Sequence, residues 1–131
     1  MATQRLRSGG PVQVLLVAGS AQLRQAWVDI LAAVPGVRVA GQFGAAADLL
    51  EWLVWTHQPW HYAFVDLALW NGPAQEWLRQ VASRRDAGTV VAVADEVSPA
   101  ARETCDRVGI RELLPRDDLE AFRGFVQKQL M

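Results

Sequence analysis

The sequence predicts an α/β domain built on a doubly wound, five-stranded parallel sheet. Short uninterrupted apolar runs alternate along the chain with longer segments whose apolar residues recur at helical spacing. The runs have no polar side, which is typical of strands in a parallel sheet that helices cover on both faces. Because crossovers between parallel strands are right-handed, five such units most often take the strand order 2-1-3-4-5.

Each expected strand is bounded by glycine, proline or polar residues. The expected strands span residues 12–17, 37–43, 62–67, 89–94 and 110–114. The third run carries a single carboxylate, Asp66, near its end. Ligands and reacting groups gather at the carboxyl ends of strands in such sheets, so Asp66 is the first candidate functional residue. An aspartate at this position can instead do no more than cap the next turn.

The segments between the strands carry the start and stop signals of helices. The expected helices span 21–34, 45–57 and 73–85, followed by a short helix opened by Ser98-Pro99 and a last helix capped by Asp117 or Asp118. Ser20 is suited to cap the first helix, and Pro73 suits the first position of the third. Gly109 is expected just past the end of the fourth. Five helices therefore alternate with the five strands.

Length and charge limit what the chain can do. Its 131 residues suffice for one domain, expected over residues 11–131, with residues 1–10 as a disordered arm. Thirteen basic against fourteen acidic residues leave a net charge of -1, which argues against binding to nucleic acid or to an anionic membrane surface. The sequence has one cysteine, Cys105, and neither a signal peptide nor an apolar run of membrane-spanning length. We therefore expect a soluble cytoplasmic protein.

Several features near the strand ends point to one family. An aspartate, Asp66, ends the third strand, the segment 109–114 leads into the fifth, and Arg116-Asp117 follows it. Together with the five-unit topology, these features resemble the receiver domain of two-component response regulators, which has a CheY-like, flavodoxin-like fold. The resemblance covers residues 12–130 and is closest to receivers fused to helix-turn-helix output domains. No output domain is expected here, so the resemblance implies a stand-alone signalling domain of the phosphorelay type.

The resemblance implies a role for each residue at the strand ends. In receivers, an aspartate at the position of Asp66 accepts a phosphoryl group from a histidine kinase. The acidic pair that helps to hold Mg²⁺ falls on Ala18 and Gly19. The hydroxyl that binds the phosphoryl group falls on Ala94, and the lysine falls on Arg116. Since Mg²⁺ needs several oxygen ligands and phosphoryl transfer depends on charge neutralisation, we expect a degenerate pocket without catalytic residues or metal. We also expect an ion pair between Asp66 and Arg116.

Two tryptophans are predicted to form an interaction surface. The helix expected over 45–57 has one apolar stripe, made of Ala46, Leu50, Leu53 and Val54. Trp52 and Trp55 fall on the opposite side, which should face water. Exposed tryptophans are typical of protein interfaces, so these two are candidates for binding a protein partner. The alternative is that loop residues such as Trp60, or the N-terminal arm, fold over them.

Two further aromatic residues lie near surfaces of interest. Trp70 comes shortly after Asp66 in the chain, and we expect it to guard the mouth of the degenerate pocket. Phe125 lies on the flank of the last helix, beside the surface through which receivers commonly pair. It is therefore an interaction candidate, and a homodimer through this surface is one option.

Three functions are considered from the sequence. The preferred hypothesis is a non-enzymatic signalling domain without a cofactor, which acts by phosphorylation-independent contact with an unidentified protein partner. The first alternative is a genuine phospho-acceptor that uses Asp66 and Mg²⁺, with Asp95 or Glu96 replacing the missing acidic pair. The second is a flavodoxin-like cofactor binder. The loop 17–21 has neither the three-glycine dinucleotide pattern nor the Walker pattern, which weighs against that last alternative.

Overall fold

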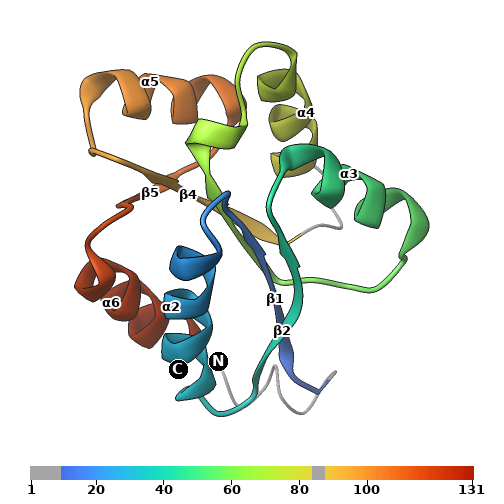
Figure 1. The fold of residues 1–131 in the computed structure, drawn as a ribbon, viewed down its shortest axis with the longest axis vertical. Coiled ribbons are helices and arrows are strands. Elements are labelled where there is room, and N and C mark those ends of the chain that lie inside the picture. The colour runs from blue at the N-terminus through green and yellow to red at the C-terminus, as the bar shows by residue number, and fades with distance from the viewer. Residues whose placement is uncertain (1–9, 84–87) are drawn as a thin grey trace.

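The computed structural model describes residues 10–83 and 88–131, and these form one parallel sheet with helices on both faces (Figure 1). The strand order is β2-β1-β3-β4-β5, as predicted. The strands are β1 (Val12–Val17), β2 (Val37–Phe43), β3 (Tyr62–Asp66), β4 (Thr89–Ala94) and β5 (Glu112–Pro115). The helices are α2 (Ala21–Ala32), α3 (Ala46–Trp55), the 3₁₀ turn η1 (Leu67–Leu69), α4 (Pro73–Ala82), α5 (Pro99–Val108) and α6 (Leu119–Leu130). The expected arm over residues 1–10 lies outside the described residues except for Gly10, as does the end of the helix expected over 73–85.

The sheet separates two apolar layers. Helices α3, α4 and α5 cover one face, and α2 and α6 cover the other (Figure 1). In the second layer the ring of Trp27 stacks on that of Phe122, with centroids 5.5 Å apart and planes 9° from parallel. Strands β1, β3 and β4 are almost wholly buried, as a parallel sheet covered on both faces requires. The uninterrupted apolar runs of the sequence therefore correspond to the inner strands.

Three strand ends differ from the sequence prediction, since β5 also ends one residue later than expected, at Pro115. Strand β3 ends at Asp66, because the side chain of Asp66 accepts a hydrogen bond from the Ala68 backbone N–H and turns the chain into η1. Strand β5 begins at Glu112, since the backbone N–H of Ile110 still bonds back to the helix carbonyl of Cys105. Gly109 ends α5 with a φ of 85°, a left-handed conformation that glycine adopts without a steric cost. The other strands have their predicted bounds.

The register of the sheet brings four chain segments to one edge. Val17 of β1 lies opposite Val65 of β3, and Asp66 lies opposite Val93 of β4. Strands β4 and β5 are paired at their ends as well, Ala94 lying opposite Pro115. The residues that follow these positions, including those predicted to form the degenerate pocket, consequently meet at the carboxyl edge of the sheet.

Candidate functional site

The centre of the candidate site is an ion pair between Asp66 and Arg116. Asp66 is only 6% exposed, which is unusual for a carboxylate. Arg116 donates from Nε to Oδ2 at 2.8 Å and from a terminal nitrogen to Oδ1 at 2.7 Å. This two-point geometry is the strongest form of an arginine–carboxylate contact. The structure therefore contains the ion pair that the sequence led us to expect.

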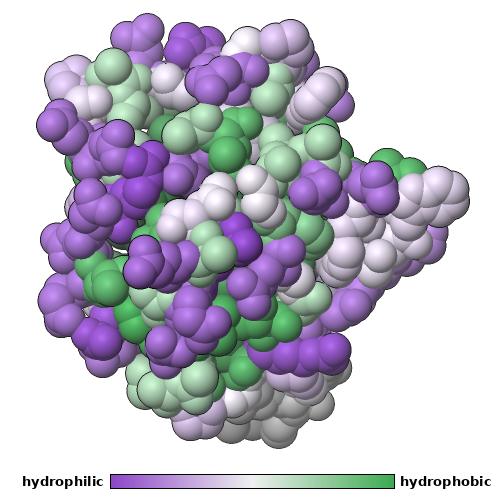
Figure 2. Space-filling view, viewed as in Figure 1, coloured by the Kyte–Doolittle hydropathy of each residue, from purple (hydrophilic) through white to green (hydrophobic). Residues whose placement is uncertain are grey.

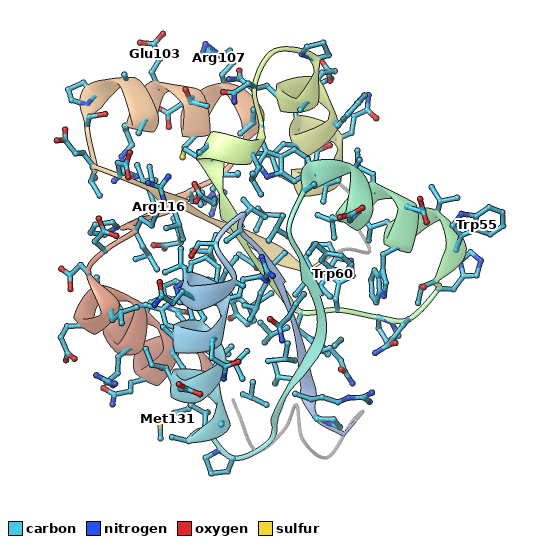
Figure 3. The ribbon with its side chains drawn as sticks, in the orientation of Figure 1. Trp55, Trp60, Glu103, Arg107, Arg116 and Met131 are labelled. Atoms are coloured by element: carbon cyan, nitrogen blue, oxygen red, sulfur yellow. The ribbon has the colours of Figure 1, made fainter. Side chains whose placement is uncertain are left out.

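Further contacts fix both partners of this pair. The Asp66 Oδ1 atom also accepts from the Ala68 backbone N–H at 3.0 Å, so the residue caps a turn as well as binding Arg116. The backbone N–H of Arg116 donates to the Ala94 carbonyl at 2.6 Å, and its guanidinium also forms an ion pair with Asp95. The hydrogen bond to Asp66 raises the pKa of Arg116 above its ordinary value. Arg116 is therefore a permanent cation between two carboxylates, and it lies at the sheet edge between α5 and the α2/α6 layer (Figure 3).

The acidic-pair positions offer no metal ligand. Ala18 is fully buried, and its backbone carbonyl accepts a hydrogen bond from Arg24 of α2. A side chain starting at Gly19 would first meet the Leu69 methyl group at 3.6 Å and the Gly44 carbonyl at 4.0 Å. Arg24 and the Leu69 methyl group therefore neighbour the two positions on which the acidic pair of a receiver falls.

The donor set of this edge does not fit Mg²⁺. Magnesium takes an octahedral set of oxygen ligands that usually includes one or two protein carboxylates. Both oxygens of Asp66 are already engaged by Arg116, and Asp95 is paired with the same guanidinium. Within residues 10–83 and 88–131, no three His, Cys, Asp or Glu side chains are grouped closely enough to hold a metal ion. We refer to Ala18, Gly19, Asp66, Ala94 and Arg116 together as the Asp66 pocket.

The predicted position of Trp70 is wrong. Its side chain is 1% exposed and packs in the apolar layer under α3, α4 and α5, together with Leu78 and Val81. The physical reason is the η1 turn, whose closing hydrogen bond runs from the Trp70 backbone N–H to the Leu67 carbonyl. Trp70 is consequently a core residue, and it does not guard the mouth of the Asp66 pocket.

Helix α3 is rotated relative to the prediction. Its inward residues are Ala46, Leu49, Leu50 and Leu53. Trp52 is half-buried, because its ring meets the edge of the Phe43 ring on β2 with centroids 6.0 Å apart. Val54, predicted to face inward, is 66% exposed. Of the two tryptophans on this helix, only Trp55 has the predicted position in water, with 78% of its surface exposed.

The remaining aromatic candidates contribute mainly to packing. Trp60 is buried, and it leaves Trp55 uncovered (Figure 3). Phe125 is half-buried, and its ring meets those of Tyr62 and Phe64 edge-on. Phe125 therefore offers only part of its ring to a partner.

Two residues near functional surfaces were missed at the sequence level. Arg24 reaches the Asp66 pocket from the first turn of α2, and its place one turn after the cap Ser20 was the available signal. Trp77 is 44% exposed on α4. A helical wheel of α4 places Trp77 beside, and not within, the stripe made by Leu78 and Val81.

Sequence comparisons find no relatives, whereas structural comparison finds many. No family model matches the chain, and a search of curated proteins gives no match. The response regulatory domain of mrkE from Klebsiella pneumoniae superposes with a TM-score of 0.73 and 13% identity, over 89% of this chain and 93% of that one. The signal receiver domain of the putative response regulator NarL from Mycobacterium tuberculosis gives 0.70 and 21%, over 91% and 96%. The response regulator domain of Thermotoga maritima CheB gives 0.72 and 17%, over 92% and 93%.

These likenesses confirm the predicted fold. The chain has the flavodoxin-like α/β arrangement of CheY-like receiver domains. In the part of the chain that the structure describes, every helix is too short or too polar to span a membrane. At identities this low the likeness is one of fold, so the function has to be argued from the Asp66 pocket and the surface.

Proposed function

We propose that this chain is a receiver-like signalling domain of the two-component type that acts by protein–protein contact and not by phosphoryl transfer. The observation that carries the proposal is the two-point ion pair between Asp66 and Arg116. A carboxylate that accepts a phosphoryl group must present a free oxygen to phosphorus. In this protein the one carboxylate at the acceptor position holds three hydrogen-bond donors instead.

The surroundings of the pair support the same conclusion. Positioning and charge neutralisation supply most of the catalysis in phosphoryl transfer, and a bound metal ion usually provides much of the latter. Ala18 and Gly19 bring no ligand for such an ion. Ala94 has no hydroxyl group with which to bind a phosphoryl oxygen and move toward it. The chain therefore lacks both the chemistry and the switch that would follow it.

Protein contact needs none of the acceptor chemistry that the Asp66 pocket lacks. Among the similar structures is a chain from the complex of the P1 domain of CheA3 with CheY6 from R. sphaeroides, with a TM-score of 0.72 and 16% identity over 92% of this chain and 95% of that one. That complex supports the proposal that a domain of this fold can work by binding another protein. We accordingly propose a non-enzymatic role with a protein partner and no cofactor.

The test is incubation with acetyl phosphate and Mg²⁺, followed by the intact mass of the protein. We expect no phosphoryl adduct on the wild type, while a phosphorylatable receiver run alongside becomes modified. The matched variant combines two substitutions. Gly19→Asp adds one carboxylate that can bind a metal ion, and Arg116→Lys removes the guanidinium that holds Asp66. Phosphorylation of the wild type that is lost in Asp66→Asn would overturn the proposal.

A working acceptor at Asp66 is the second candidate, because one observation favours it. Asp95 lies close enough to pair with Arg116, so a second carboxylate is present at the pocket. If Arg116 swung away, Asp66 and Asp95 could share a cation. This candidate predicts an adduct on the wild type that both Asp66→Asn and Asp95→Asn remove.

A further inference from the structure

An apolar groove lies between α3 and α4, away from the Asp66 pocket. It has a volume of about 320 Å³ and is lined by Leu50, Leu53, Val54, Trp77, Gln80 and Val81. We call these six residues the α3–α4 groove. The volume falls at the lower end of the roughly 300–1,000 Å³ range of binding pockets. Five of the six lining residues are apolar, so the groove is suited to apolar side chains.

Exposed apolar residues gather around this groove. In the described part of the chain five large apolar side chains are exposed, and three of them, Val54, Trp55 and Trp77, belong to α3 and α4. Trp55 projects from the end of α3 away from the body of the molecule (Figure 3). Figure 2 shows this end of α3 as a projection of pale and green residues with hydrophilic residues around it. Exposed apolar residues that cluster in this way mark interaction surfaces.

The charges on the described rim of the groove are acidic. Helix α3 carries two carboxylates and no basic residue; Glu51 lies beside the groove, whereas helical spacing puts Asp48 on the far side of the helix from Leu50. Glu51 lies one helical turn before Val54 and Trp55, and therefore beside them on the helix surface. On α4, Glu76 is paired with Arg79 of the same helix, with Nε and Oε2 2.8 Å apart, so this pair adds no net charge. A basic partner would complement this surface.

The same charges argue against a second copy of the chain as the occupant. A two-fold symmetric dimer places the same surface of each subunit against the other. The Glu51 carboxylates of both copies would then lie in the same interface, with no basic residue of α3 to separate them. A different protein with basic residues fits the charge better.

We propose that the α3–α4 groove binds a basic amphipathic helix of a partner protein. Apolar residues one turn apart on that helix enter the groove and pack on Leu53 and Val81, while its lysines or arginines approach Glu51. A helix laid between two helices is a common recognition mode, and it matches the groove's two helical walls. The inference rests on the proposed function, because it names the partner class for the contact proposed there.

The probe is a fluorescein-labelled synthetic peptide of leucine and lysine with helical spacing, and its matched control has glutamate in place of each lysine. Binding to the full chain is followed by fluorescence anisotropy. We expect the lysine peptide to bind and the glutamate peptide not to bind. Glu51→Lys should weaken binding by about tenfold or more, because a like charge then faces the peptide. The matched charge reversal Glu103→Lys, on the outer face of α5, should leave affinity unchanged (Figure 3).

Three results would overturn the inference. One is equal binding of both peptides, or of neither. Another is loss of binding in Glu103→Lys equal to that in Glu51→Lys, which would make the effect one of net charge. The third is self-association of the wild type that disappears in Trp55→Ser, measured by sedimentation, because the occupant would then be a second copy.

The phosphorylation assay separates the two proposals. If the protein binds the peptide and is also phosphorylated on Asp66, the groove proposal stands and the proposed function is overturned. If the protein is not phosphorylated and does not bind the peptide, the proposed function stands and the groove proposal is overturned. Neither result depends on the other, since the Asp66 pocket and the α3–α4 groove share no residue.

Discussion

In the Asp66 pocket charged side chains bind one another, whereas around the α3–α4 groove apolar side chains face water. Both oxygens of Asp66 are held by Arg116, and a second carboxylate meets the same guanidinium. Around the groove, Val54 and Trp55 contribute exposed surface that no described part of the chain covers. The difference teaches where a partner could gain free energy. Opening the pocket would break satisfied charge pairs, but covering the groove would remove apolar surface from water.

The largest effect on stability is expected at Trp70, whose side chain the η1 turn places in the apolar core and not at the Asp66 pocket. Trp70→Ala should lower the free energy of unfolding by about 3–5 kcal/mol, the usual cost of removing a large buried aromatic side chain. Urea denaturation followed by circular dichroism measures it. The control is Trp70→Phe, which keeps an aromatic ring and removes the buried indole N–H, for which residues 10–83 and 88–131 provide no hydrogen-bond partner. A change in Trp70→Ala as small as that of a surface substitution would mean that Trp70 guards the pocket after all.

The next effect is expected at Arg116. Arg116→Ala leaves the buried Asp66 carboxylate without its cation, so the free energy of unfolding should fall by about 2–3 kcal/mol, less than the roughly 3–5 kcal/mol for a fully buried pair because the Arg116 side chain is 19% exposed. The double variant Asp66→Ala with Arg116→Ala should recover part of this loss, since it leaves no unpaired charge. Arg79→Ala breaks a fully exposed pair and serves as the matched control, with no measurable change expected. Equal stability of Arg116→Ala and Arg79→Ala would show that the Asp66–Arg116 pair is solvated.

The pH dependence of the pair follows from the direction of its pKa. The pKa of Arg116 is raised, so the group holds its proton more tightly in the folded state than in the unfolded state. The stability that this confers is fully present below the unfolded pKa of arginine, which lies far above neutral pH, and is lost only at still higher pH. Between pH 7 and pH 10 the difference in stability between the wild type and Arg116→Ala should therefore stay constant.

The sequence predicted the fold and the pocket for the same physical reason. Strands buried on both faces must be apolar throughout, so each inner strand, such as β3 and β4, was visible as an apolar run. The strand order places the carboxyl ends of these strands side by side, so Asp66 at the end of the third strand and Arg116 after the fifth were predicted to form an ion pair. The contact of Arg24 with the Ala18 carbonyl was not predicted, although its place one turn after Ser20 put it near the end of β1.

The surface was predicted less well than the pocket. On α3, apolar residues occur almost all the way round, so the sequence does not fix which of them face inward. The prediction left out Leu49 and placed Val54 in the core, and the rotation error then put Trp52 in water. The contact between the Trp52 and Phe43 rings keeps Trp52 half-buried, and this contact depends on the neighbouring strand β2. A helix with a narrow apolar stripe, such as α4, left less room for such an error.

A smaller effect is expected from the buried thiol of Cys105. Burial raises the pKa of this thiol, so the folded state holds the proton more tightly than the unfolded state does. By linkage, the associated stability is present below the ordinary thiol pKa of about 8.5 and is lost as the pH rises through the folded value. Urea titrations at a series of pH values above 8 should therefore show the wild type losing more stability than Cys105→Ala. Parallel pH profiles for the two proteins would contradict this prediction.

The smallest effect on stability is expected at Trp55, and it is the most informative for the comparison. Trp55→Ser removes a side chain that is 78% exposed, so the free energy of unfolding should change by no more than about 0.5 kcal/mol. Trp55 does not line the groove, but it follows the groove residue Val54 at the end of α3. Affinity for the lysine-containing amphipathic peptide should therefore fall by about tenfold or more, because an exposed tryptophan at an interface supplies much of the binding free energy. Val97→Ser, at an exposed apolar position outside the groove, should change neither quantity. A loss of stability in Trp55→Ser as large as that in Trp70→Ala would mean that Trp55 is covered within the folded chain. The apolar surface beside the groove would then not be open to a partner, and the contrast with the closed Asp66 pocket would be wrong.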